Sequence, residues 1–363
     1  MMSELRRDPF TRTWVVIAPG RSSRPRQIPA AAPTPPAARA RCPFCPGHEQ
    51  ETPEELWRLP APDATWAVRV VRNRYPLLTP RAQTTAHRAG VRPGEGLFIR
   101  ADGVGSHEVV IESPHHDWDL PDGDDTAVAN VLRAYRARCA ALRAKRPGLV
   151  LPFRNHGAAA GSSLPHPHSQ IMATPIVPLR HRHLFDVARA HYDDTGRCLY
   201  TDVRDAELAD GARIIAASEH AVVLAPFAPR APYETWLMPR VHHASFADTP
   251  DAVLAGTAAL LRRLLAALRH LLGDIAYNYL LLSAPNGEEG TDYFLWHLQL
   301  LPHLTETAGF ELGSGMAVIT VPPEQAAADL RNALAQLSSG SRSPGHGAAV
   351  QKRTEGPGQA AVR

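Results

Sequence analysis

The chain has 363 residues and is nearly balanced in charge, with 39 Lys and Arg against 36 Asp and Glu. Because 44% of its residues are hydrophobic and the net charge is only +3, the composition excludes a charge-swollen disordered protein and a strongly basic nucleic-acid-binding protein. Its four cysteines argue against a secreted disulfide scaffold, and the first residues do not resemble a signal peptide. We therefore expect a cytoplasmic protein of one large or two ordinary domains, with no nucleic-acid or membrane partner.

Taken in chain order, the sequence first predicts a strand over residues 14–18, closed by Pro19 and Gly20. The alternation of Ala and Pro over 29–40 then predicts an unstructured segment. At the other end of the chain, residues 338–363 mix Ser, Gly, Pro and charge with almost no bulky apolar side chain. We predict a disordered tail there.

Between these segments, one order of elements occurs for the first time at residues 107–116, which predict a strand. The strand leads through turn residues to a helix over 125–145, whose apolar residues fall on one face. The helix leads in turn to an extended run that ends at His166 and His168.

The same order returns about 130 residues later, with a strand over 233–239, a helix over 249–272 and an extended run over 296–300. We infer an α+β protein of duplicated halves, each an antiparallel sheet that carries a long helix. Two unrelated domains, with a chance repetition, are the alternative. The halves are placed at residues 1–178 and 179–337.

Cys42 and Cys45 form a C-x-x-C pair in a Pro-rich turn, which lets two thiolates face one metal ion. Histidines later in the chain could complete a tetrahedral site. A redox pair is the main alternative, but such a pair normally opens a helix, and Pro46 and Gly47 disfavour a helix here. Cys139 lies on the apolar face of a predicted helix and is expected in the core.

The segment from Asn155 to Gln170 carries the densest group of polar residues. Because side chains alternate along an extended chain, His166, His168 and Gln170 project from one face, and Pro167 indicates a strand end or an edge strand. The Gly and Ser residues upstream could bring backbone N–H groups close to phosphate oxygens, although an ordinary Gly/Ser turn is the alternative. An imidazole with one nitrogen held as N–H can attack phosphorus through the other, and His168 suits that role.

These residues resemble the galactose-1-phosphate uridylyltransferase family, a branch of the histidine-triad superfamily. The likeness covers about residues 5–337, and its most specific part is the His-Pro-His-x-Gln run that ends at Gln170. It implies that His168 takes the nucleotidyl group covalently, that Gln170 holds the phosphoryl oxygens and that Ser163 contacts phosphate. It also implies a zinc site with the ligands Cys42, Cys45, His116 and His166, where His115 would replace His116 if the register shifts by one.

The resemblance further implies a ping-pong exchange that transfers UMP between a nucleotide sugar, UDP-glucose, and a sugar 1-phosphate, galactose 1-phosphate. Family members are homodimers, in which N-terminal arginines, here Arg21 and Arg24, reach across to the sugar phosphate. The other substrate-binding residues that the match implies are Asn73, Tyr75, Asn155, Gly161, Ser162, Ser163 and Phe310.

Two departures from the family pattern bear on function. Gln299 stands where a second structural metal would need a histidine, so we predict no second metal site and no nucleophile in the second half. Gly309 and Ser314 stand where uridylyltransferases carry a lysine and a tyrosine, and this segment resembles that of ADP-sugar phosphorylases. An ADP-sugar phosphorylase or adenylyltransferase is therefore the alternative function, and a non-enzymatic nucleotide-binding histidine-triad protein is a third.

Overall fold

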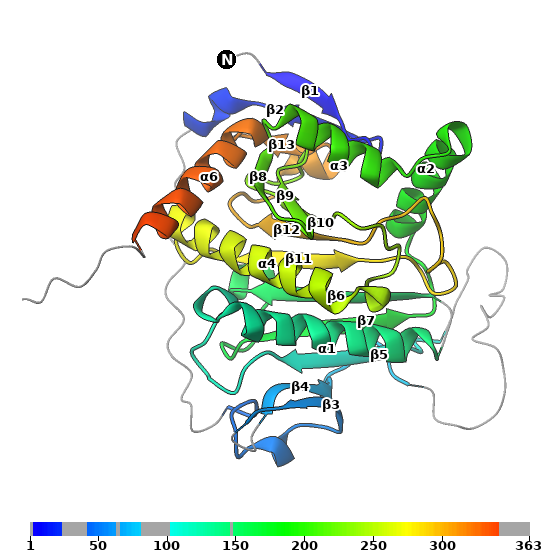
Figure 1. Cartoon of the computed structure of the whole chain (residues 1–363), viewed down its shortest axis with the longest axis vertical. Coiled ribbons are helices and arrows are strands. Elements are labelled where there is room, and N and C mark those ends of the chain that lie inside the picture. Colours follow the sequence, from blue (N-terminus) through cyan, green and yellow to red (C-terminus); the bar gives the residue numbers. More distant parts are fainter. Residues whose placement is uncertain (1–2, 24–41, 63–65, 81–101, 146–147, 341–363) are drawn as a thin grey trace, which may run out of the picture.

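The computed structural model describes residues 3–23, 42–62, 66–80, 102–145 and 148–340. The Ala and Pro segment at 29–40 and the predicted phosphate-binding Arg24 lie outside the described residues. Figure 1 shows one layer of strands running through the molecule, with the long helices α1 (Asp125–Arg143) and α4 (Asp251–Leu272) side by side on one face.

In the described chain these strands form a ten-stranded sheet whose neighbouring pairs are all antiparallel. From one edge, the first half contributes β3 (Glu55–Pro60), β4 (Trp66–Arg72), β5 (Ser106–Ile111), β7 (His168–Thr174) and β6 (Leu149–His156). The second half continues with β11 (Tyr277–Leu282), β12 (His297–Pro302), β10 (Thr235–Pro239), β9 (Ala221–Leu224) and β8 (Ile214–Ala217). The second order is the reverse of the first, which confirms the predicted duplication.

Strands β6 and β11 join the two halves at the centre of the sheet, where Phe153 pairs with Leu280. On its other side Phe153 pairs with Gln170 of β7, and Leu280 pairs with Gln299 of β12. A pseudo-two-fold axis therefore passes through the Phe153–Leu280 pair, and it relates β7 to β12 and α1 to α4. The axis equates Gln170 with Gln299.

Helices α1 and α4 pack on the sheet because each presents an apolar stripe at helical spacing. The predicted face of α1, from Val128 to Leu142, is buried, and Asp124 caps this helix by accepting a hydrogen bond from the N–H of Ala127 at 2.7 Å. Helix α4 ends at Gly273, where φ is +78°. One hydrophobic core lies beneath both helices and extends across both halves.

The opposite face of the sheet differs between the halves. In the second half, α2 (Leu179–Thr195) and α3 (Leu199–Asp210) cover it and pack with Trp236 and Phe294 in a second core cluster. In the first half, the same face holds a small cluster around Trp66. Gln170 is consequently part-exposed, whereas its equivalent Gln299 is buried.

A smaller sheet brings the two ends of the described chain together. Strand β1 (Glu4–Arg7) pairs with β2 (Trp14–Ile17), which confirms the strand predicted at 14–18, and β2 pairs in parallel with β13 (Val318–Ile319). The predicted boundary after residue 178 assigns β1 and β2 to the first half. In the structure, however, β2 pairs with β13, a strand of the second half.

Helix α5 (Gly309–Ser314) precedes β13, and α6 (Pro323–Gly340) follows it and packs on α4. The predicted tail is wrong over its first residues, because Ser338 continues α6 and its hydroxyl donates to the carbonyl of Leu334 at 2.9 Å. The tail after residue 340 lies outside the described residues. Among the described helices, none combines the length and apolar character that a membrane span needs.

Candidate active site

Strand β7 begins at His168, because the preceding Pro167 has no N–H to donate to the sheet. The Nδ1–H of His168 donates to the carbonyl oxygen of His166 at 2.8 Å, which fixes the tautomer of the ring. Burial lowers the pKa of His168, so the ring is neutral at pH 7 and carries its lone pair on Nε2. A nucleophilic imidazole needs this arrangement.

Cys42, Cys45, His116 and His166 come together in a cluster that could hold a metal ion, with their donor atoms within 4.8 Å of one another. The Nδ1 of His166 lies 3.6 Å from each sulfur. The Nδ1 of His116 lies 3.4 Å from the sulfur of Cys45 and 3.4 Å from the Nδ1 of His166. The C-x-x-C turn thus meets two histidines that are distant in the sequence, and the cluster includes His116 in place of its neighbour His115.

Hydrogen bonds around the cluster orient its members. The Nε2–H of His166 donates to the carbonyl of Ser113 at 2.8 Å, which leaves the lone pair on Nδ1, facing the sulfurs. Burial lowers the pKa of His166 to about 4, so this ring is also neutral at pH 7. His48 donates from Nδ1 to the carbonyl of Cys42 at 2.7 Å. Because the carbonyl of His166 also holds His168, one residue connects the cluster to the candidate nucleophile.

The turn between β6 and β7 depends on two glycines. Gly157 and Gly161 have φ values of +80° and +89°, which residues with a side chain rarely adopt, and they flank a 3-10 turn at Ala158–Ala160. A Cβ on Gly157 would also lie 3.0 Å from the Cβ of Ala276. The predicted phosphate-contacting Ser163 follows in an exposed position, and Ser162 turns its hydroxyl to the carbonyl of Leu164 at 3.1 Å.

Asn155 holds this turn together with a residue from the second half. The Nδ2 of Asn155 donates to the carbonyl of Gly161 at 3.4 Å. Asn278, its partner across the β6–β11 pair, donates from Nδ2 to the Oδ1 of Asn155 at 2.8 Å and to the carbonyl of Ala160 at 3.0 Å. His303 contacts the Oδ1 of Asn278 at 2.6 Å. No local sequence motif pointed to Asn278 or His303, because their contacts depend on the register between the halves.

Gln170 lies two residues after His168 and has a partner that was not predicted, His107 of β5. The Oε1 of Gln170 is 2.7 Å from the Nε2 of His107. Asn73 lies at the same place, with its Nδ2 at 3.1 Å from the Nε2 of His107 and its Oδ1 accepting from the N–H of Tyr75 at 2.8 Å. Two sequence-predicted residues, Asn73 and Gln170, are therefore brought together on one buried histidine.

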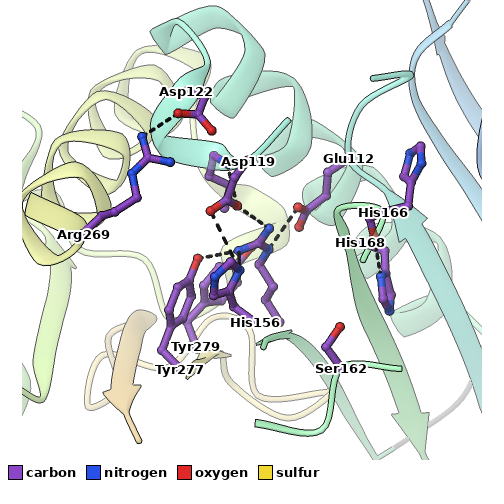
Figure 2. A network of polar contacts seen from close by, with 12 residues as sticks. Glu112, Asp119, Asp122, His156, Ser162, His166, His168, Arg269, Tyr277 and Tyr279 are labelled. Atoms are coloured by element: carbon purple, nitrogen blue, oxygen red, sulfur yellow. Dashed lines mark hydrogen bonds and ion pairs between the residues drawn. The ribbon is translucent and has the colours of Figure 1, made fainter. Parts of the chain in front are cut away.

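A buried polar network lies near His168, partly visible in Figure 2 as the group of Glu112, Asp119 and Tyr277. The guanidinium of Arg154 on β6 connects these three residues. It donates to Glu112 at 3.0 Å, to Asp119 at 2.6 Å and to the hydroxyl of Tyr277. Burial raises the pKa of Glu112, while Arg154 opposes that shift. The sequence motifs pointed to none of these residues.

The second half repeats the backbone geometry of the candidate nucleophile. His297 begins β12, and its Nδ1–H donates to the carbonyl of Leu295 at 3.0 Å, as His168 does to His166. The metal-cluster residue His166 is thus replaced by Leu295. Burial lowers the pKa of His297 to about 4, and the ring stacks 4.7 Å from that of Trp236.

This equivalence changes the reason for expecting no nucleophile in the second half. Gln299 corresponds to Gln170 and replaces no histidine in the pseudo-two-fold arrangement. The expectation depends instead on His297, which is fully buried and has the Nε2 of Gln299 at 3.0 Å from its own Nε2. The absence of a second metal site stays a prediction.

The remaining predicted substrate-binding residues lie on the surface. Tyr75 is 81% exposed and Phe310 of α5 is 54% exposed, and Arg21 is exposed in a 3-10 turn at Pro19–Ser23. Within the described part of the chain, none of the three makes a hydrogen bond or ring contact with His168. Their roles stay predictions.

Comparisons with known proteins fit this geometry. The family model described as galactose-1-phosphate uridyl transferase, N-terminal domain, matches residues 1–178. The chain is 35% identical over 333 residues to ADP-glucose phosphorylase of Arabidopsis thaliana, covering 90% of this chain and 92% of that protein. The chain belongs to the galactose-1-phosphate uridylyltransferase family. As a member of that family it is a nucleotidyltransferase.

Other relatives and solved structures also match most of the chain. The galactose-1-phosphate uridylyltransferase of Thermotoga maritima is 27% identical over 339 residues, covering 91% of this chain and 98% of that protein. Among solved structures, the Arabidopsis ADP-glucose phosphorylase with bound ADP-glucose superposes with a TM-score of 0.78 at 33% identity, over 91% of this chain and 98% of that chain. A uridylyltransferase structure superposes with a TM-score of 0.69 at 28% identity, over 93% and 99% of the chains.

Proposed function

We propose that the protein is an ADP-sugar phosphorylase that uses His168 as its nucleophile. The observation that carries this proposal is the combination of a neutral His168, held by the carbonyl of His166, with full-length similarity to an ADP-glucose phosphorylase. The solved relative with bound ADP-glucose supports the same donor. We therefore favour the ADP-sugar phosphorylase, which Gly309 and Ser314 suggested as the alternative, over uridylyl transfer.

In the first step, the lone pair on Nε2 of His168 attacks the α-phosphorus of ADP-glucose. The bond from that phosphorus to the bridging oxygen breaks, and glucose 1-phosphate leaves with the electron pair. In the second step, an oxygen of inorganic phosphate attacks the adenylyl phosphorus, which releases His168 and forms ADP. Because the first product leaves before phosphate reacts, the kinetics are ping-pong.

The neighbours of His168 provide donors for the charge on the reacting phosphoryl group. The amide nitrogen of Gln170 would donate to a phosphoryl oxygen, because the Oε1 atom already contacts His107. The turn from Gly157 to Ser163 brings backbone N–H groups near the same strand end. Asn73 and Tyr75 are assigned to the nucleoside.

We assign zinc to the cluster of Cys42, Cys45, His116 and His166. Tetrahedral zinc with Zn–S of about 2.3 Å and Zn–N of about 2.05 Å requires separations of about 3.6 Å between sulfur and nitrogen and about 3.4 Å between two nitrogens. Four of the six separations between the donor atoms are 3.4–3.6 Å and agree with this requirement, and the other two are within 4.8 Å. Zinc would supply a rigid anchor for the backbone of His166, whose carbonyl orients His168; it would not touch the substrate.

We also assign a homodimer, in which Arg21 and Arg24 of one subunit reach the sugar phosphate bound by the other. The exposure of Arg21 and Phe310, and their lack of contact with His168 in the described chain, are compatible with a site that a second copy completes. The sugar 1-phosphate is released in the first step, and it is the reactant when that step runs in reverse.

Uridylyl transfer between UDP-glucose and galactose 1-phosphate is the second candidate function. It is favoured by relatives such as that of Thermotoga maritima, which matches 91% of this chain. The same histidine and the same amide would serve, and only the base and the acceptor would differ.

A donor and acceptor assay separates the two. Purified protein is given ADP-glucose or UDP-glucose, each with inorganic phosphate or galactose 1-phosphate, and glucose 1-phosphate release is measured. We expect turnover with ADP-glucose and phosphate at least tenfold above the other three pairs. Preference for UDP-glucose with galactose 1-phosphate would assign the second candidate, and no release from any pair would contradict both.

A further inference from the structure

His107 is the buried residue on β5 whose ring links Gln170 to the segment 73–77. Its Nε2 lies 2.7 Å from the Oε1 of Gln170. Its Nδ1 accepts a hydrogen bond from the N–H of Leu77 at 3.1 Å, and its carbonyl accepts from the N–H of Asn73 at 2.8 Å. Two side-chain contacts and one backbone contact of His107 therefore connect the segment proposed to hold the nucleoside to the amide proposed to hold the phosphoryl group.

The contact with Leu77 determines the tautomer of His107. A backbone N–H can only donate, so the Nδ1 of His107 carries a lone pair. Burial lowers the pKa of His107 and keeps the ring neutral at pH 7, so the hydrogen is on Nε2. That hydrogen can donate to the Oε1 of Gln170. The amide nitrogen of Asn73 also lies 3.1 Å from Nε2, but the two atoms are both donors and form no hydrogen bond.

The orientation of Gln170 follows from this bond. An amide has one oxygen and one nitrogen, so fixing Oε1 on His107 turns the NH2 group away from His107. The equivalent glutamine of the second half, Gln299, is held in a similar way. Its Oε1 accepts from the guanidinium of Arg230 at 2.7 Å, and its Nε2 lies 3.0 Å from the Nε2 of His297. The pseudo-two-fold relation therefore predicts that the amide nitrogen of Gln170 turns toward the Nε2 side of His168, where the proposed transfer would bind the phosphorus.

We propose that His107 is a positioning residue, which holds the amide nitrogen of Gln170 toward the reacting phosphoryl group. The proposal rests on the proposed nucleotidyl transfer and deepens it. It predicts that His107 affects the rate only through Gln170.

The test is a double-mutant cycle in the full-length protein with the nucleotide sugar that the wild type uses. His107→Leu removes both ring contacts, and Gln170→Leu removes the amide. We expect His107→Leu to lower kcat about tenfold or more with little change in KM, and to cause no further loss in the Gln170→Leu background. An equal loss in both backgrounds would overturn the proposal, because His107 would then act independently of Gln170.

Two further variants separate positioning from a purely structural role. His107→Gln keeps an N–H donor at the position of Nε2, and we expect its kcat to stay within about threefold of wild type. His107→Asn can still accept from Leu77 but is too short to reach Gln170, and we expect it to behave like His107→Leu at an unchanged melting temperature. A His107→Gln variant as slow as His107→Leu, at wild-type melting temperature, would contradict the proposal. If the wild type itself turns over no nucleotide sugar, the proposed function is refuted instead.

Discussion

A histidine whose Nδ1–H is held by the carbonyl two residues before it occurs in each half, at His168 and at His297. The two rings differ in what surrounds them. His297 is stacked on Trp236 and contacts Gln299, so its Nε2 faces protein. His168 is also buried, but it packs against Phe44, and α2 and α3 belong to the core cluster of the second half. Residue type and tautomer therefore do not distinguish the two rings, and we infer that their different surroundings assign the proposed chemistry to His168.

At this scale the sequence predicted residues that form local motifs. The strand end at Pro167 agrees with the structure, and His168 and Gln170 both lie on β7, whereas His166 precedes the strand and its ring belongs to the metal cluster. His107 was not identified, because its partner Gln170 is 63 residues away and the contact depends on the β5–β7 register. A lone histidine in an apolar strand carries no signal until that register is known.

At the scale of elements, the metal cluster brings together three loops of the first half. These are the C-x-x-C turn before β3, the segment after β5 and the segment before β7. Four ligands bound to one ion would hold all three, and with them the carbonyl that orients His168.

Cys42→Ser is therefore expected to lose the metal and a few kcal/mol of unfolding free energy. Elemental analysis and thermal melting of the purified protein provide the two measurements. Cys139→Ala is the matched control, because Cys139 is buried on the core face of α1 and lies outside the cluster. It is expected to keep the metal. Full metal content in Cys42→Ser would show that the thiolate is not a ligand.

The sequence also predicted some elements better than others. Helix α1 was expected over 125–145 and spans Asp125–Arg143, because its apolar stripe and the cap at Asp124 are local signals. The β1–β2–β13 sheet was not expected, because β2 pairs with two residues near the other end of the chain. The start of the tail was misplaced because α6 continues through the Ser and Gly residues up to Gly340, although these residue types disfavour a helix.

At the scale of the whole molecule, the polar network around Arg154 joins the two halves. Arg154 of the first half bonds Tyr277 of the second, and His156 reaches Asp274 at 2.7 Å. Figure 2 shows Arg269 of α4 paired with Asp122 near the same group. The pseudo-two-fold equivalent of Arg154 is Leu281, a core residue, so the network is present on one side of the axis only.

Replacing Arg154 tests how strongly this network contributes to stability. Arg154→Met leaves the carboxylates of Glu112 and Asp119 buried without their partner, and we expect a loss of about 3–5 kcal/mol in unfolding free energy. The matched control is Arg262→Met, which breaks the exposed pair with Asp125 between α4 and α1 and should cost at most about 1 kcal/mol. Equal losses in urea unfolding would mean that the buried network does not hold the halves together.

The duplication itself was predictable, because strand, helix and extended run repeat with similar local patterns. The position of the pseudo-two-fold axis was not, because it depends on the pairing of Phe153 with Leu280 between segments far apart in the sequence. The axis equates Gln299 with Gln170 and places Asn278 against Asn155. Site residues contributed by the second half could therefore be identified only from the structure.

The central claim is that His168 carries the nucleotidyl group covalently. The most direct measurement is intact mass of the protein after incubation with ADP-glucose in the absence of phosphate, followed by peptide mapping. We expect a gain of one adenylyl group on the peptide that contains His168, lost again when phosphate is added. We expect no gain in His168→Ala and full gain in His183→Ala, which removes an exposed histidine of α2. An adduct retained in His168→Ala, or turnover of ADP-glucose by the wild type with no adduct on His168, would contradict the central claim.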